Sequence, residues 1–247
     1  WAHPVIADGK LFLREQDELS AYNLLRETPL VSLPSSPTPG TEFAELVRLG
    51  PSVRMLSRGQ SKIRLLSFSI NDGKVRLPVI ALSDRHVDVD GALTEAVANE
   101  LRLMKSAFIL DVAGSRVGAD GIRQAARFKS LVGLNLAVCE QVDDQALEPL
   151  QSAEGLRVLG VTGTRIGPAG LFHISELPDL VALDLEVCDN VSDSACDVLA
   201  RMTNIRALNL KKTAFEKNRI SAAGLKKLAG LQKLELLNLY AESINDE

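Results

Sequence analysis

Cysteine and histidine, on which most metal and thiol chemistry depends, are scarce in this sequence. Of its 247 residues, 3 are cysteine and 3 are histidine. The histidines, His3, His86 and His173, lie far apart along the chain, whereas a metal site needs several ligands that come together at defined spacing. We therefore propose no metal ligand, no cofactor and no catalytic residue, and we expect that the protein is not an enzyme.

An excess of positive charge and long apolar runs are absent as well. The chain has 28 lysine and arginine residues against 32 aspartate and glutamate residues, and its net charge of -4 argues against general binding of polyanions. We expect no nucleic-acid partner. No run reaches the roughly 18 apolar residues of a transmembrane helix, so we expect no membrane span. The hydrophobic fraction of 46% is ample for a buried core.

What the sequence does have is a short phrase that returns at a nearly fixed interval. Each copy is a triplet of an aliphatic residue, a small or polar residue and a second aliphatic residue. The triplets are Leu110/Val112, Leu134/Leu136, Leu159/Val161, Leu183/Leu185, Leu208/Leu210 and Leu237/Leu239. The spacing of about 24 or 25 residues, with a longer last step, indicates an array of stacked supersecondary units.

The other positions of the repeat are chemically consistent from copy to copy. Because side chains alternate along a strand, the two aliphatics of a triplet point to one face and the residue between them to the other. A small hydrogen-bonding residue follows at Ser115, Cys139, Thr164, Cys188 and Thr213, and then a buried aliphatic at Val117, Val142, Ile166, Val191 and Ile244. Apolar residues then recur at every third position, which predicts a helix with one inward stripe in each repeat.

The phrase LxLxxC followed by VDDQAL or VSDSAC resembles the cysteine-containing, ribonuclease-inhibitor-like class of leucine-rich repeats. The resemblance covers roughly residues 106–247, with a degenerate copy at residues 86–103. It implies an α/β solenoid with parallel strands on the concave face and helices on the convex face. It also implies binding, without naming the partner.

Residues 1–24 have a different pattern. Short alternating segments at residues 4–7, 10–14 and 19–23 predict three strands, the first two joined by Asp8-Gly9. The stretch resembles the closing blade of a quinoprotein-type or WD-like β-propeller. An isolated hairpin is the alternative. The quinoprotein resemblance would imply an extracytoplasmic protein, and the sequence otherwise predicts no compartment.

The stretch between these two patterns predicts a linker and a cap. Residues 25–42 contain Pro29, Pro34, Pro37 and Pro39 among serines and threonines, a composition that predicts a linker. Residues 43–84 do not fit the repeat period, and we expect them to form an N-terminal cap of the repeats at 85–247. Because the chain starts at Trp1 and its last repeat is truncated, we interpret it as part of a longer protein.

The thiols and glycines have structural explanations. Cys139 and Cys188 occupy the same position two repeats apart, which predicts α-carbons roughly 10 Å from each other, beyond disulfide reach. Cys196 falls on an inward helical stripe. Gly160, Gly163, Gly167 and Gly170 are explained by tight turns of the repeat rather than by a phosphate-binding loop.

Two classes of function remain. The first is a non-catalytic scaffold that binds a protein partner on the concave strand face, where side chains between the buried aliphatics are expected to project without being needed for packing. The residues predicted to contact the partner are Asp111, Asn135, Asp184, Glu186, Asn209, Lys211, Asn238 and Tyr240. The alternative is an accessory repeat module of a larger propeller-containing enzyme or assembly factor whose active part is missing here.

Overall fold

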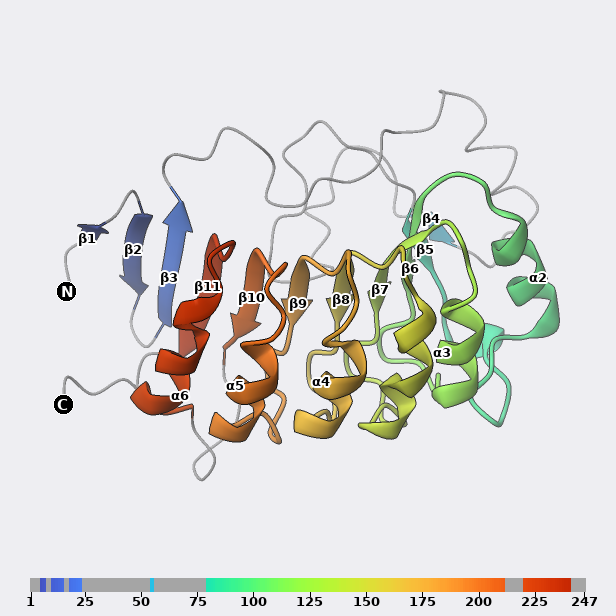
Figure 1. Ribbon diagram of the computed structural model, residues 1–247. Coiled ribbons are helices and arrows are strands. Elements are labelled where there is room, and N and C mark those ends of the chain that lie inside the picture. The colour runs from blue at the N-terminus through green and yellow to red at the C-terminus, as the bar shows by residue number, and fades with distance from the viewer. Residues whose placement is uncertain are drawn as a thin grey trace.

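Seven strands in parallel, in chain order, form the body of the sheet. The computed structural model describes residues 79–211 and 220–240 and, as strands only, residues 5–7, 10–15, 18–23 and 54–55, and of Tyr240 only the backbone. The seven parallel strands are β5 (Val79–Ala81), β6 (Phe108–Asp111), β7 (Leu131–Asn135), β8 (Val158–Gly160), β9 (Ala182–Asp184), β10 (Ala207–Leu210) and β11 (Leu236–Tyr240). Each connection returns the chain to the same end of the sheet (Figure 1).

The helices of the described residues all lie on one face of this sheet (Figure 1). They are η1 (Asp84–His86), α2 (Glu95–Leu103), α3 (Ala119–Ala125), η2 (Gln145–Ser152), α4 (Pro168–Ile174), α5 (Asp193–Leu199), α6 (Ala222–Lys227) and η3 (Leu228–Gly230). η2 is a 3-10 helix with Pro149 inside it, and a proline removes one backbone donor from a helix. The fold is an α/β leucine-rich-repeat solenoid, as predicted.

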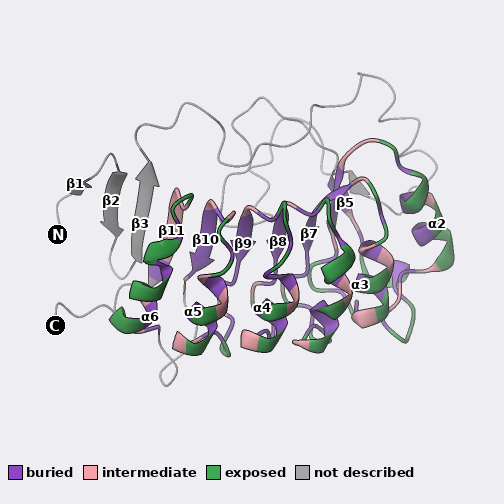
Figure 2. Cartoon of the chain, in the orientation of Figure 1, coloured by how far each residue is buried: buried purple, intermediate pink, exposed green. Residues whose placement is uncertain are grey.

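The predicted triplets are in register from strand to strand. Leu110, Leu134, Leu159 and Leu183 are successive partners across β6 to β9. Leu159, Val161, Leu183 and Leu185 are all 0% exposed, and each inward helical stripe from Ile122 to Ile205 is buried with them in one core (Figure 2). The assigned register is therefore confirmed for these repeats, whereas Thr213 and Ile244 lie outside the described residues.

Strands from the N-terminal part lie at both ends of the parallel sheet. β1 (Val5–Ala7), β2 (Lys10–Glu15) and β3 (Glu18–Asn23) are antiparallel, as predicted, and β3 pairs with β11. β4 (Arg54–Met55) pairs antiparallel with β5 at the opposite end. The parallel sheet thus starts at β5, ahead of residue 85, where we expected the repeats to begin.

Two kinds of repeat alternate along the solenoid. In the glycine repeats, whose strands are β6, β8 and β10, the buried aliphatics Val117, Ile166 and Ile220 follow the strand, and Gly121, Gly170 and Gly224 occupy one helix position. In the aspartate repeats, whose strands are β7 and β9, Val142 and Val191 follow the strand, Ala146 and Ala195 occupy that helix position, and Asp144 or Asp193 lies between the two. Asp144 Oδ1 accepts a hydrogen bond from Gly167 N at 2.6 Å, and Asp193 Oδ1 accepts one from Ser221 N at 2.7 Å. Each aspartate thus satisfies a free backbone donor at the start of the next helix.

None of the helices among the described residues combines the length and the apolar character needed to cross a membrane.

Candidate functional site

The sheet face away from the helices carries two rows of side chains in strict register. The aliphatic row is Val79, Ile109, Gly133, Val158, Ala182, Ala207 and Leu236, each the partner of the next on the neighbouring strand. The Asx row lies two residues further along each strand and comprises Asp111, Asn135, Gly160, Asp184, Asn209 and Asn238. The sequence prediction therefore brought its main polar residues together correctly.

Side chains of the Asx row bond to one another in Asp–Asn pairs. Asn135 Nδ2 donates to Asp111 Oδ1 at 2.9 Å, and Asn209 Nδ2 donates to Asp184 Oδ1 at 2.8 Å. An amide beside a carboxylate supplies a donor and avoids the repulsion of two adjacent carboxylates. The two pairs lie on either side of Gly160, which has no side chain to continue the row.

A third row, at the carboxyl ends of the strands, is fixed by the Asx row. This rim row comprises Ala113, Ala137, Thr162, Glu186 and Lys211. In each of four repeats the Asx side chain accepts a hydrogen bond from the rim-row backbone N two residues on, at 3.0 to 3.1 Å. Glu186 Oε2 also accepts from Asn209 Nδ2 at 3.2 Å. The Asx row therefore fixes, through these hydrogen bonds, the loops that follow the strands.

The expectation that the Asx row is exposed and free of structural work is wrong for most of its members. Asn135 is 5% exposed, Asp184 2% and Asn209 0%. Asp111 and Asn238 are half-buried, and so are Glu186 and Lys211 of the rim row. Burial raises the pKa of the Asp111 carboxyl, against the lowering effect of hydrogen bonds from Ala113 N and the Asn135 side chain. For Tyr240, the remaining predicted contact, the side chain lies outside the described part.

The aliphatic row, which the sequence analysis missed, is buried as completely as the core from Val79 to Ala207, and Leu236 is half-buried. Val158, Ala182 and Ala207 are each 0% exposed, and Ile109 is 2% exposed. Val158 lies between Gly133, which has no side chain, and Ala182. The signal was in the sequence, because the residue before each triplet is aliphatic or small in every strand. Parallel strands buried on both faces have such near-continuous apolar runs.

The cysteines are structural, as predicted. All three are free and buried, and Cys139 Sγ and Cys188 Sγ donate to the carbonyl oxygens of Val112 and Val161 in the preceding repeat at 3.2 and 3.1 Å. Burial raises the pKa of the Cys188 thiol to about 11 and also raises that of Cys139. Among residues 79–211 and 220–239, no group of histidine, cysteine and acidic side chains is placed to hold a metal ion.

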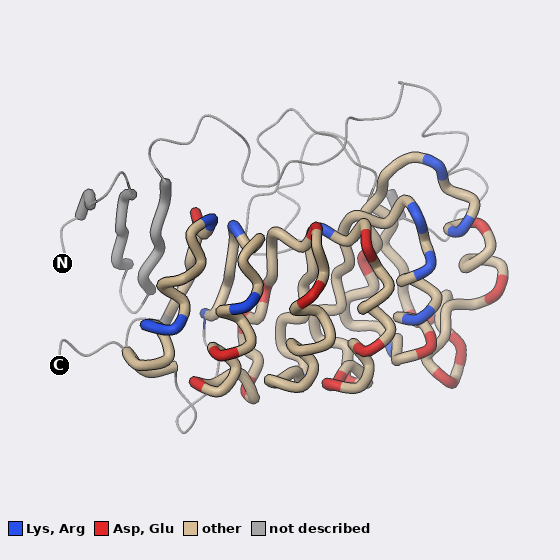
Figure 3. The backbone as a smooth tube through the Cα atoms, in the orientation of Figure 1, with Lys and Arg blue, Asp and Glu red and all other residues tan. Residues whose placement is uncertain are grey.

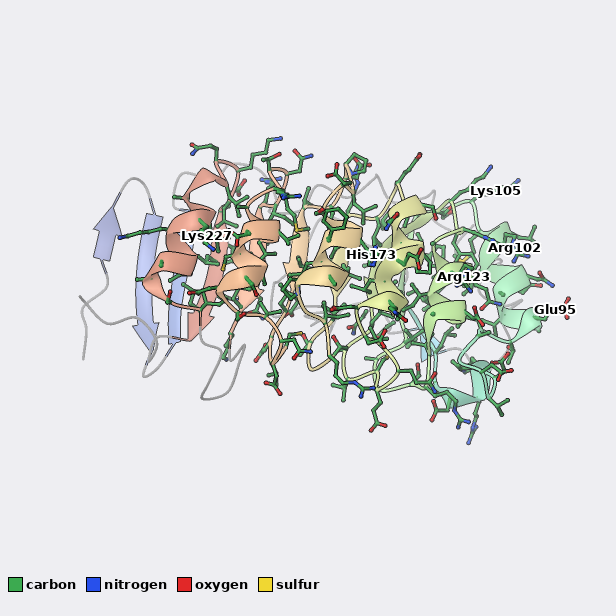
Figure 4. All side chains as sticks on the ribbon, turned by 60° about the horizontal axis from the view of Figure 1, so that its bottom comes forward. Glu95, Arg102, Lys105, Arg123, His173 and Lys227 are labelled. Carbon is green, nitrogen blue, oxygen red and sulfur yellow. The ribbon has the colours of Figure 1, made fainter. Side chains whose placement is uncertain are left out.

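The convex face carries polar contacts between neighbouring repeats. His173 Nδ1 on α4 lies 2.6 Å from Gln151 Nε2 on η2. Lys227 Nζ on α6 lies 2.9 Å from Asp197 Oδ1 on α5. Both labelled side chains lie on the helical side of the molecule (Figure 4). Charges of both signs are distributed over the helices and loops (Figure 3). His173 therefore has a structural partner on the convex face.

Comparison with known proteins gives structural neighbours only. No family model and no curated protein matches the sequence. An internalin (inlF) from Listeria monocytogenes is similar at 20% identity and a TM-score of 0.42, over 58% of this chain and 37% of that one. An internalin C2 (inlC2) from the same organism is similar at 13% identity and a TM-score of 0.34, over 65% of this chain and 80% of that one. The chain therefore spans well under two thirds of the first neighbour.

Proposed function

We propose that the chain is a non-catalytic scaffold that binds a protein partner along the concave face and its rim row. The observation that supports this is the strict register of the aliphatic row and the Asx row, which lie on the sheet face away from every described helix. A face with aligned apolar side chains beside a polar row has the composition of a surface that packs against polypeptide. A rigid array of this kind presents it over several repeats.

The predicted contact residues divide into two groups in this proposal. Asp111, Glu186, Lys211 and Asn238 are half-buried, so a partner can reach them first. Asn135, Asp184 and Asn209 are buried, and they support the rim row from below through the hydrogen bonds described above. Tyr240, at the end of β11, is kept as a proposed contact at the far end of the face.

Site-specific photo-crosslinking tests the proposed face. A crosslinking residue at Thr162, in the rim row, should form an adduct with a polypeptide in native extract. The matched control is Phe172 on the convex face, which is 51% exposed. An adduct at Phe172 with none at Thr162 would contradict the proposal, as would the absence of any adduct. With the partner in hand, Glu186→Ala should weaken binding by about 1.5 to 3 kcal/mol for each hydrogen bond to its carboxylate, whereas Lys226→Ala should not.

We also propose the domain division and repeat class suggested by the sequence. Residues 1–24 would be a partial propeller blade, 25–42 a linker, 43–84 a cap and 85–247 the repeats. The hydrogen bonds from Cys139 and Cys188 to the preceding repeat support the cysteine-containing, ribonuclease-inhibitor-like class.

The second candidate function is an accessory module of a larger propeller-containing enzyme or assembly factor. The three antiparallel strands β1 to β3 support it, because consecutive antiparallel strands make up a propeller blade. Sequencing the full reading frame tests it. Several blade-like repeats ahead of residue 1 are expected, and a frame without them would exclude this candidate.

A further inference from the structure

The turns that follow strands β6 to β9 carry a row of residues with a positive φ, which we call the turn row. It comprises Gly114, Val138, Gly163 and Val187. Glycine adopts this left-handed conformation freely, whereas a β-branched residue is strained in it. The glycine repeats therefore have the unstrained residue at this position, and the aspartate repeats have the strained one.

Burial does not offset the strain of the two valines. Val138 is 61% exposed, and Val187 is half-buried. An apolar side chain that stays in contact with water contributes little to the free energy of unfolding. The fold itself therefore does not need a valine at these positions, and strained residues of this kind cluster at binding sites.

Backbone hydrogen bonds between neighbouring turns hold the valines in place. Each turn-row backbone N donates to a rim-row carbonyl oxygen of the next repeat, at 2.8 to 3.0 Å. The turns thus continue the pairing of the strands, and neighbouring turns keep a spacing of about 4.8 Å. Val138 and Val187 are two repeats apart, so they lie roughly 10 Å from each other. Gly163, between them, has no side chain.

An exposed carboxylate follows each valine two residues later. These are Glu140 and Asp189, and among the described residues neither carboxylate has a hydrogen bond or an ion pair. In the glycine repeats the corresponding residue is an arginine that has a partner. Arg116 Nε lies 3.5 Å from Asp84 Oδ1, and the Arg165 guanidinium donates to Glu140 O at 2.6 Å. The aspartate repeats alone thus present an apolar group beside an unpaired charge.

The surrounding turns are negatively charged overall. Residues 137–144, 162–167 and 186–190 contain five acidic residues and one basic residue, Arg165. A surface with an excess of carboxylates attracts a positively charged partner and disfavours a negatively charged one.

We infer that Val138, Val187 and the carboxylates beside them contact an extended, positively charged segment of the protein partner. Two residues three positions apart in an extended chain are separated by about 10 Å, which matches the distance between the two valines. The segment therefore presents two large apolar side chains three positions apart, together with lysine or arginine. This inference rests on the proposed function, because it names the chemistry of the partner and adds the turn row to the rim row as the surface that the partner contacts.

Selection of peptides on the full chain tests the inference. The probe is a phage-displayed library of random peptides of about 12 residues, selected on the immobilised wild-type chain. We expect the enriched sequences to have two large apolar residues three positions apart and an excess of lysine and arginine. A synthetic peptide of the enriched sequence is then titrated against the wild type and the variants, and its binding is followed by fluorescence anisotropy.

A double glycine variant separates binding from folding. Val138→Gly together with Val187→Gly should weaken peptide binding at least about tenfold, because two apolar contacts are lost. The same variant should unfold at an equal or higher urea concentration than the wild type, because glycine relieves the strain. A purely structural role of the valines would lower that concentration. The matched control is Phe172→Ala on the convex face, where the side chain is 51% exposed, and it should leave peptide binding unchanged.

A second pair of substitutions tests the charge. Glu140→Gln together with Asp189→Asn should weaken peptide binding about threefold or more at low ionic strength, and the difference should disappear at about 0.5 M sodium chloride, because salt screens exposed charges. The matched control is Glu148→Gln together with Asp179→Asn, which removes two exposed carboxylates elsewhere and should leave binding unchanged.

Several outcomes would overturn the inference. They are the absence of any enriched peptide, enriched peptides that lack the apolar pair or the positive charge, and equal affinity of the wild type and either double variant. Self-association of the wild type that the double glycine variant abolishes, measured by analytical ultracentrifugation, would overturn it as well, because the occupant would then be a second copy.

The two proposals can fail separately. A photo-crosslinked adduct at Thr162 that forms equally well in the double glycine variant would contradict this inference and leave the proposed function standing. Enriched peptides whose binding depends on the two valines, with no adduct at Thr162 in native extract, would support the inference and count against the proposed function.

Discussion

The glycine repeats and the aspartate repeats share one core and differ where each helix meets its neighbour. In both kinds, the strand aliphatics and the inward helical stripe are buried. At the start of the helix, an aspartate repeat projects Asp144 or Asp193 toward the next unit, and the glycine repeat that follows leaves room for it. A side chain at Gly170 would place Cβ 2.6 Å from Asp144 Oδ1, and at Gly224 the same atom would overlap Asp193 Oδ1.

This difference shows that the stacking unit is a pair of repeats. The carboxylate replaces water at free backbone donors of the next helix, and glycine removes the Cβ that would block it. The thiols follow the same alternation, since Cys139 and Cys188 belong to aspartate repeats whereas Ser115 and Thr164 belong to glycine repeats. The residues at these positions therefore differ between the two kinds of repeat, whereas the buried apolar positions are of the same type in both.

The largest expected effect concerns what the two kinds share. Leu185→Asp in an aspartate repeat and Val161→Asp in a glycine repeat should both unfold the central repeats. Each substitution loses the stabilisation of about 1.5 to 3 kcal/mol that the buried aliphatic side chain contributes, and it adds the cost of an unpaired buried charge. Thermal melts followed by circular dichroism measure this, with Lys226→Ala as a surface control. A melting curve like that of the wild type for either variant would mean that the assigned core is wrong.

The second prediction separates the two kinds at the helix position where they differ. Gly224→Ala should destabilise the chain by about 1 to 3 kcal/mol, because the new Cβ overlaps the Asp193 carboxylate. In an Asp193→Ala background the same change should be neutral or stabilising by up to about 1 kcal/mol, since alanine is the better helix former. Urea denaturation of the four chains gives the coupling energy.

The matched control for this cycle is in an aspartate repeat. Ala195→Gly, at the corresponding position, should cost about 1 kcal/mol with or without Asp193. If Gly224→Ala costs the same in both backgrounds, the aspartate and the glycine are not coupled and the paired-repeat interpretation fails.

The third prediction concerns the turn after the strand, where both kinds adopt a positive φ. Gly114 and Gly163 have φ of 68° and 65°, whereas Val138 and Val187 have 56° and 57°. A β-branched residue there is strained by about 1 to 2 kcal/mol. Val138 is 61% exposed, so Val138→Gly should be neutral or raise the free energy of unfolding despite the lost side chain.

The reverse change in a glycine repeat completes this comparison. Gly114→Val meets no atom within 4 Å of the new Cβ, so any loss reports backbone strain alone, and we expect about 1 to 2 kcal/mol. Urea denaturation measures both changes. Equal stability of Gly114→Val and the wild type would show that the turn tolerates a β-branched residue without strain.

The sequence predicted those parts of the fold that depend on short-range periodicity. The triplets from Leu110 to Leu239 and the helical stripes recur in every repeat, so many weak signals agreed on one register. β5 lies in the stretch that we assigned to the cap, because its repeat lacks the small polar or thiol position that identified the others. The pairing of β3 with β11 joins segments far apart in the chain, and no local pattern specifies it.

The polar row on the strands was predicted in its register but not in its environment. Alternation along the strand placed Asp111, Asn135, Asp184 and Asn209 on one face correctly. Their hydrogen bonds join neighbouring strands some 24 or 25 residues apart in the chain, which the periodicity of a single strand does not encode. The pairing of Asp193 with Gly224 was readable, since glycine and alanine alternate at Gly121, Ala146, Gly170, Ala195 and Gly224, but it required comparing repeats two apart.

The smallest expected effect comes from the thiols of the aspartate repeats. Burial raises the pKa of Cys188 from 9.0 to about 11 in the folded chain, so the folded state holds this proton more tightly than the unfolded state. The resulting stability is fully present below pH 9 and is lost as the pH rises toward about 11. Between pH 8 and pH 10 we expect Cys188→Ser to reduce the loss of stability by about 1 kcal/mol, because a serine hydroxyl does not ionise in this range.

Urea denaturation at the two pH values gives the comparison, with Thr164→Ser in a glycine repeat as the matched control. Thr164 Oγ1 donates to Val161 O at 2.6 Å, and serine keeps that hydroxyl, so its pH dependence should equal that of the wild type. Cys188 Sγ donates to the same carbonyl oxygen from the next repeat, and ionisation of the thiol removes the donor as it buries a charge. A Cys188→Ser chain that loses as much stability as the wild type between pH 8 and pH 10 would show that this thiol does not contribute to the pH dependence.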